Sequence, residues 1–131
     1  MSYARQLLDI DGASAPDPGV LSETIDALND CAQACTADSD ADLREADVAS
    51  MVTCIRLCLD CTDVCTATVA VISRRAAYDQ AVIRPVLEAC AATCARCAVE
   101  CERHAAEHEH CRVCGQACRR CEQACRELLA A

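Results

Sequence analysis

Residues 90–101 read CAATCARCAVEC, which separates four cysteines by 4, 3 and 4 residues. On an α-helix, side chains three and four positions apart lie on one face, and this stripe stays within about 60° of arc. A β-strand would distribute the same residues over both faces. The stretch therefore predicts a helix with one face made of thiols, at positions where a helical bundle normally has leucines.

The same rhythm recurs in three other stretches. Residues 54–65 repeat the 4-3-4 spacing, residues 111–125 follow 3-4-3-4, and residues 31–35 add one more spacing of four. Four such helices with short connections favour antiparallel neighbours. We expect an all-α fold, an antiparallel up-down-up-down four-helix bundle with a cysteine-lined core. The cysteines are Cys31, Cys35, Cys54, Cys58, Cys61, Cys65, Cys90, Cys94, Cys97, Cys101, Cys111, Cys114, Cys118, Cys121 and Cys125.

Capping residues and helix breakers predict the boundaries. Residues 1–11 suit a short N-terminal helical extension, and GASAPDPG (12–19) reads as a linker because proline and glycine interrupt helices. Asp17 is a candidate N-cap with Pro18 at the first helical position. These features divide the chain into an extension with its linker, 1–17, and a cysteine-rich four-helix bundle, 18–131.

The polar segment TADSDAD (36–42) predicts the first turn of the bundle. Ser39, Asp40 or Asp42 would then cap the second helix, which should run to about residue 74. Asp79 is a candidate cap for the third helix. The third and fourth helices are expected over about 79–105 and 108–129.

The cysteine numbers also predict how the helices align. In an antiparallel hairpin, residues at one level have numbers that add to a constant. This pairs Cys54 with Cys101, Cys58 with Cys97, Cys61 with Cys94 and Cys65 with Cys90, and centres a turn near residues 77–78. The same rule places Cys35 level with Cys54, and Cys31 level with Cys58.

Composition excludes several classes of function. A net charge of −9 argues against nucleic acid as a partner. No apolar run approaches the roughly 20 residues that span a membrane, and the start MSYARQLLDID has no features of a signal peptide. We therefore expect a cytoplasmic protein. No nucleophile–base pair, phosphate loop or carboxylate pair is visible, so we expect no enzyme activity.

The thiols need an explanation beyond packing. A reducing compartment, an odd count of fifteen and helical spacing all argue against a disulfide scaffold. Free cysteine is often a small buried hydrophobe, but so many in register would leave a poorly filled core. Aligned sulfurs select soft metals, namely Cu(I), Zn(II) or iron–sulfur clusters.

The spacing favours Cu(I) among these metals. Structural zinc needs four converging ligands, and a straight helix cannot wrap one ion. Iron–sulfur motifs normally lie in loops around the cluster. Cu(I) accepts two or three ligands and shares bridging sulfurs, so we expect multiple Cu(I) ions per chain. Zinc or cadmium sequestration and iron–sulfur electron transfer remain the alternatives.

The two ends of the predicted tube differ. Met51 and His104 lie at one level just beyond the first cysteines, and His108 belongs to the adjacent turn. Thioether and imidazole groups are further candidate Cu(I) ligands at this mouth. His110 could be either a ligand or a solvated side chain. At the other end Ile72 and Ile83 share a level and predict an apolar plug.

The sequence resembles the copper storage proteins, a cysteine-rich four-helix-bundle family, over about residues 18–129. The resemblance rests on C-x3-C, then C-x3-C-x2-C-x3-C twice, then C-x2-C-x3-C-x2-C-x3-C. It implies cytosolic storage of many Cu(I) ions as thiolate clusters, with the family's cysteines carried over onto the fifteen here. It also implies a homotetramer, and a copper chaperone is a candidate donor.

Overall fold

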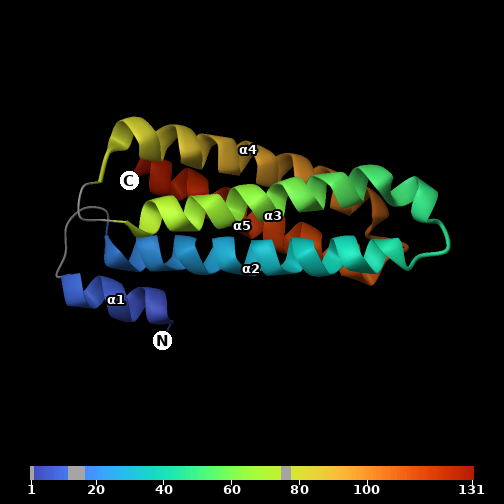
Figure 1. The fold of residues 1–131 in the computed structure, drawn as a ribbon, viewed down its shortest axis with the longest axis horizontal. Helices are drawn as coiled ribbons and strands as arrows, with labels where there is room; N and C mark the ends of the chain where they lie inside the picture. The colour runs from blue at the N-terminus through green and yellow to red at the C-terminus, as the bar shows by residue number, and fades with distance from the viewer. Residues whose placement is uncertain (1, 12–16, 75–77) are drawn as a thin grey trace.

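Four long helices lie side by side and form the body of the protein (Figure 1). The computed structural model describes residues 2–11, 17–74 and 78–131. The helices are α1 (Tyr3–Asp11), α2 (Pro18–Leu43), the 3₁₀-helix η1 (Val48–Met51), α3 (Val52–Ser73), α4 (Gln80–His104) and α5 (Glu109–Ala130). Those ranges contain no β-strand, which confirms the all-α class.

Successive long helices run antiparallel and form a closed ring of neighbours (Figure 1). Helix α2 packs on α3 and α5, and α4 packs on the same two helices. Within the described ranges the backbones of the diagonal pairs, α2 with α4 and α3 with α5, do not approach each other closely. This arrangement is the up-down-up-down bundle that the sequence predicts. Helix α1 lies outside the ring and packs on α2.

Two of the predicted helix starts are confirmed by their caps. The Asp17 carboxylate accepts the backbone N–H of Gly19 at 2.7 Å and that of Val20 at 3.2 Å. The Asp79 carboxylate accepts the N–H of Ala81 at 2.9 Å. Each aspartate satisfies backbone donors that the first helical turn would otherwise leave unpaired. The rest of the predicted linker, residues 12–16, and residues 75–77 before Asp79 lie outside the described residues.

The prediction of a turn at residues 36–42 is wrong. Helix α2 continues to Leu43, so the first connection comes later and α3 begins only at Val52. The residues expected to cap a new helix are therefore inside α2. Asp38 and Asp42 are buried there, because they continue the core-facing spacing of α2 and find hydrogen-bond partners inside the bundle.

The predicted plug is present at the end of the bundle where α2 and α4 begin. Its apolar side chains are buried and come from all four long helices, namely Leu21, Ile72, Ile83, Leu87 and Leu128. They close the core where α3 and α5 end. None of the helices in the described ranges is long and apolar enough to cross a bilayer.

Candidate metal centre

The core between the helices is lined with sulfur. All fifteen cysteines are free thiols, and each has a relative exposure of 0–1 %. The four long helices each contribute them, since the spacings of three and four turn each stripe inward. The whole predicted set is therefore brought into one buried column.

The alignment predicted for α3 and α4 is confirmed by sulfur–sulfur distances. Cys58 Sγ lies 3.7 Å from Cys97 Sγ, and Cys61 Sγ lies 3.7 Å from Cys94 Sγ. One level further, Cys65 and Cys90 are 3.9 Å apart. The rule that residue numbers at one level add to a constant holds here, because both helices keep an unbroken α-helical repeat between their first and last cysteines.

The alignment predicted for α2 is wrong by about one helical turn. Cys35 Sγ lies 3.6 Å from the sulfurs of both Cys114 and Cys118, not at the level of Cys54. Cys31 Sγ is correspondingly deeper, at 3.7 Å from Cys61 and 3.8 Å from Cys118. The shift has a simple cause, since α2 runs on through the segment that was predicted to be a turn.

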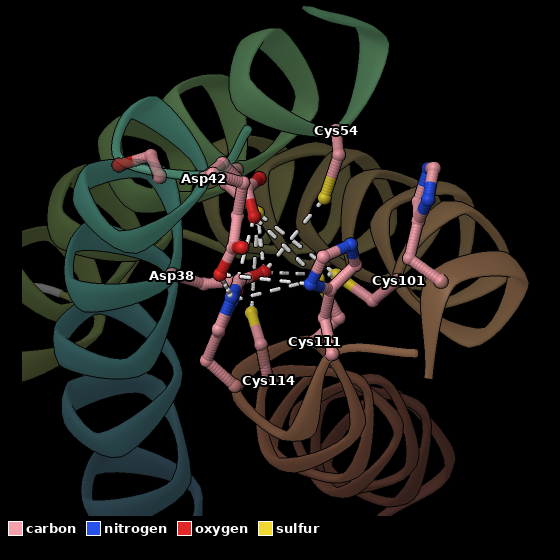
Figure 2. A network of polar contacts seen from close by, with 12 residues as sticks. Asp38, Asp42, Cys54, Cys101, Cys111 and Cys114 are labelled. Carbon is pink, nitrogen blue, oxygen red and sulfur yellow. Dashed lines mark hydrogen bonds and ion pairs between the residues drawn. The ribbon is translucent and has the colours of Figure 1, made fainter. Parts of the chain in front are cut away.

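Asp38 takes the place beside Cys54 and Cys101 where Cys35 was predicted. Its Oδ2 lies 3.7 Å from Cys54 Sγ, 3.5 Å from Cys58 Sγ and 3.6 Å from Cys101 Sγ. One turn further, Asp42 Oδ1 lies 3.5 Å from Cys111 Sγ. Figure 2 shows both carboxylates directed at the sulfurs between the helices.

These two aspartates were not predicted as site residues, although their spacing in the sequence indicates the core-facing side of the helix. Cys31, Cys35, Asp38 and Asp42 have the same 4-3-4 spacing as the cysteine stripes. Residues 36–42 are rich in Asp, Ser and Thr, and this composition is typical of a turn. The spacing, which predicts a continuing helix, was the more accurate guide here than the composition.

His110 closes the polar end of the column. Its Nδ1 lies 2.5 Å from Asp38 Oδ1 and 3.6 Å from Cys111 Sγ, and its Nε2 lies 2.9 Å from Glu45 Oε1. Burial alone would lower the pKa of His110, but the hydrogen bonds to Asp38 and Glu45 outweigh burial and raise it above its usual value. The imidazolium form, which donates from both nitrogens, fits this position.

Asp42 is in the opposite situation, because the contacts of its Oδ1 with Cys111 and His110 do not outweigh its burial. Burial and the neighbouring Cys54 and Asp38 side chains raise the pKa of Asp42 to about 8. Its Oδ2 has no hydrogen-bond partner among the described residues. A protonated Asp42 therefore fits the metal-free column, and the same oxygen is available as a ligand.

The three residues predicted at the mouth lie there, and the two histidines among them have carboxylate partners. His104 Nε2 lies 2.9 Å from Glu100 Oε2, and His108 Nε2 lies 3.3 Å from Asp47 Oδ2. Met51 is fully buried at the start of α3. Their assignment as metal ligands stays a prediction, and His110, left unassigned by the sequence, is the histidine beside a cysteine.

The sulfurs form overlapping groups with the dimensions of metal sites. Two groups of four thiols each have all ligand atoms within 4.8 Å of one another, as does a mixed group of one carboxylate and three thiols. These groups are Cys31/Cys35/Cys61/Cys118, Cys31/Cys65/Cys94/Cys121 and Asp38/Cys54/Cys58/Cys101. Shared sulfurs allow bridging between ions, and thiolates select soft metals.

Burial disfavours the charged thiolate form of the cysteines in the column. Hydrogen bonds with Cys121 and Cys90, together with burial, raise the pKa of Cys125. A thiolate deeper in the column than Cys111 lacks solvent and a cationic partner, since the buried charged side chains of the described residues are all acidic. Metal binding must therefore displace thiol protons.

Comparisons with known proteins agree with this geometry. The sequence model of a family described as copper storage protein matches residues 19–130. The chain is 53 % identical to the Streptomyces lividans copper storage protein Ccsp, solved with 10 copper equivalents, at a TM-score of 0.95 over 98 % of each chain. No curated protein matches the chain.

Two further solved structures of the Streptomyces lividans protein are similar. The cytosolic copper storage protein with five coppers is 57 % identical, with a TM-score of 0.85 over 86 % of this chain and 94 % of that one. A variant with one histidine replaced by alanine is 56 % identical, with a TM-score of 0.87 over 89 % and 98 %.

Proposed function

The chain belongs to the copper storage protein family, and from this we propose that it stores multiple Cu(I) ions in the cytosol as thiolate-bound ions and clusters inside its bundle. The observation that carries the proposal is the column of fifteen buried free thiols. The protein holds ions and transforms no substrate, so its role is to bind and limit free copper.

Charge balance supports a monovalent cargo. Each Cu(I) that replaces one thiol proton leaves the net charge of the column unchanged. Buried charge is costly without a partner, and the described residues provide no buried cation. Filling with about one Cu(I) per thiol, with sulfurs shared between ions, therefore avoids an accumulation of charge inside the bundle.

Copper would pass the polar end of the column first. Asp38, Asp42 and His110 surround the first sulfurs there, whereas the opposite end is closed by the apolar plug. Met51, His104 and His108 are proposed as additional ligands at this mouth. Their thioether and imidazole groups bind Cu(I) more weakly than thiolate clusters and would pass the ion inward.

The protein is further proposed to act as a homotetramer and to receive copper from a chaperone. Helix α1 supports the assembly, because Tyr3, Leu7 and Ile10 form an exposed apolar stripe at helical spacing. No contact with nucleic acid or membrane is expected. The negative net charge of −9 opposes binding to either surface.

Anaerobic titration of the reduced protein with Cu(I) tests the storage function. We expect ultraviolet thiolate–copper absorption to rise to about 15 ions per chain or somewhat more, because bridging thiolates are shared. Proton release should accompany uptake, since each ion displaces a thiol proton. Saturation at three or four ions would contradict storage.

A further inference from the structure

Four sulfurs in the middle of the column have the shape of a discrete tetrahedral site. Cys31 and Cys35 come from α2, Cys61 from α3 and Cys118 from α5, and all four sulfurs lie within 4.8 Å of one another. Four of the six sulfur–sulfur separations are 3.7 Å for Cys31–Cys61, 3.8 Å for Cys31–Cys118, 3.6 Å for Cys35–Cys118 and 4.0 Å for Cys31–Cys35.

These separations match a tetrathiolate site for a divalent ion. Zinc–sulfur bonds of about 2.3 Å in a regular tetrahedron require sulfur–sulfur edges of about 3.8 Å. A single helix cannot supply such a set, but three helices converge here with two ligands from one and one from each of the others. The metal-free column already has the cage, so binding needs little rearrangement.

We propose that the copper-free protein binds one Zn(II) per chain, or Cd(II) or Co(II) in its place, at Cys31, Cys35, Cys61 and Cys118. The reaction is M²⁺ + 4 RSH → [M(SR)₄]²⁻ + 4 H⁺, in which four S–H bonds break and four metal–sulfur bonds form. No change of oxidation state is involved.

Neighbouring thiols stabilise the charge of this site. The Cys114 thiol donates to Cys35 Sγ at 3.6 Å, and Cys61 Sγ lies 3.7 Å from Cys94 and 3.9 Å from Cys65. Three S–H groups that are not ligands can therefore donate to the thiolates that are. They can do so only while they remain protonated, which limits how many divalent ions the column accepts.

A second divalent ion is disfavoured because of the charge that it adds, as the adjoining group of four sulfurs shows. Cys65, Cys94 and Cys121 form it together with the same Cys31. A second ion there would share that sulfur, consume two of the three thiols that donate to the first site and leave a net charge of −3 without a buried cation. Copper avoids this cost, so Cu(I) loading should expel the divalent ion.

Co(II) titration of the reduced, metal-free protein under anaerobic conditions tests the site. We expect the intense visible bands of tetrahedral thiolate-bound Co(II) to saturate at one ion per chain and to disappear on addition of Zn(II) or excess Cu(I). Weak bands of six-coordinate Co(II), or continued growth to several ions per chain, would overturn the proposal.

Two serine variants on α5 form a matched pair. Cys118→Ser removes a ligand and should weaken Zn(II) binding by more than the roughly 10- to 100-fold that outer-shell changes cause. Cys121→Ser, one turn along the same helix, should retain the bands and bind within a few-fold of the original. Equal losses in both variants would refute the assignment.

Copper capacity measured on the same two variants separates this site from storage. Each should lose only about one of the roughly 15 Cu(I) ions, and circular dichroism should show both folded. A failed divalent site with normal copper capacity would leave the storage function intact.

Discussion

Asp38 Oδ1 lies 2.5 Å from His110 Nδ1, a contact between residues 72 positions apart that joins the end of α2 to the first turn of α5. The second ring nitrogen lies 2.9 Å from Glu45 Oε1. The imidazole is thus held between two carboxylates beside Cys111, at the polar end of the sulfur column. This contact determines both the protonation of His110 and its position relative to the first thiols.

The contact predicts a raised pKa for His110 in the metal-free protein. Replacing Asp38 with Asn removes the closer carboxylate, so the pKa of His110 should fall toward its usual value near 6.5. Asp47→Asn is the matched control, because Asp47 contacts His108 instead. NMR titration of the ring protons measures both. An unchanged His110 pKa in Asp38→Asn would contradict the assigned contact.

Asp42 predicts how the stability of the metal-free protein depends on pH. Burial raises its folded-state pKa to about 8 from an ordinary value of 3.8. Between these values the folded state keeps a proton that the unfolded state has lost, so the free energy of unfolding should fall as pH rises from about 5 to about 8. The raised pKa values of Asp38 and His110 act in the same direction.

Asp42→Asn keeps a neutral side chain of similar size and should flatten this dependence. The variant should be more stable than the original protein at pH 8 and differ less at pH 5. Asp40→Asn, on the exposed side of α2, serves as the control. Urea unfolding of the reduced proteins gives the comparison, and parallel curves for original and Asp42→Asn proteins would argue against a buried neutral Asp42.

The periodicity of the cysteines predicted most of the fold and of the site. Spacings of three and four define a helix face regardless of composition, which is why the alignment of Cys58 with Cys97 and of Cys61 with Cys94 was correct. The caps Asp17 and Asp79 also follow from local chemistry, since each meets backbone donors within three residues.

The α2 alignment and the polar mouth were not predicted, because the turn-like composition of residues 36–42 was given more weight than their spacing. Asp38 and Asp42 resemble turn residues until the partners that satisfy their carboxylates are known, and those partners come from α3, α4 and α5. Treating them as a turn misplaced Cys31 and Cys35 by one level. The position of His110 depends on the same alignment, so its contact with Asp38 could not be predicted.

The bundle should remain folded without metal. The apolar plug and the outer helix faces supply packing, and protonated thiols are tolerated in a core. We expect circular dichroism of the fully reduced, chelator-treated protein to stay strongly helical, with cooperative thermal unfolding. Ile72→Ala, in the plug, should cost about 2–5 kcal/mol of stability. Loss of helicity on metal removal, as in zinc fingers, would contradict this.

The exposed stripe on α1 is the surface that we propose for assembly. Tyr3, Leu7 and Ile10 are 83 %, 63 % and 79 % exposed, while Leu8 anchors the helix at 5 %. If the chain forms the proposed homotetramer through this stripe, replacing the three exposed residues with Ser should shift the particle to a smaller species in light scattering. Serine at Val82, Val99 and Val113, also exposed, is the control. Dissociation only in the control would place the interface on the bundle instead.

The asymmetry of the column predicts that uptake rate and capacity depend on different residues. His110→Gln alters the polar mouth and should slow uptake from a Cu(I) donor while barely changing the final capacity. Cys65→Ser with Cys90→Ser removes deep thiols 3.9 Å apart, and should lower capacity by about two ions with little effect on the initial rate. Stopped-flow uptake and metal analysis measure the two quantities.

The pair Met51→Leu and His104→Leu extends this experiment to two of the other proposed mouth residues. If they carry copper inward, uptake and removal should both slow, because ligands at the mouth act on the barrier to binding and deep thiolates set the equilibrium.

The hydrogen bond of His104 to Glu100 at 2.9 Å allows a second test of this role. Glu100→Gln frees the imidazole without removing it, so it should leave uptake faster than the double leucine variant. Equal uptake rates in the original protein and the double variant would exclude both residues from the path, and leave Asp38 and His110 as the groups that admit copper.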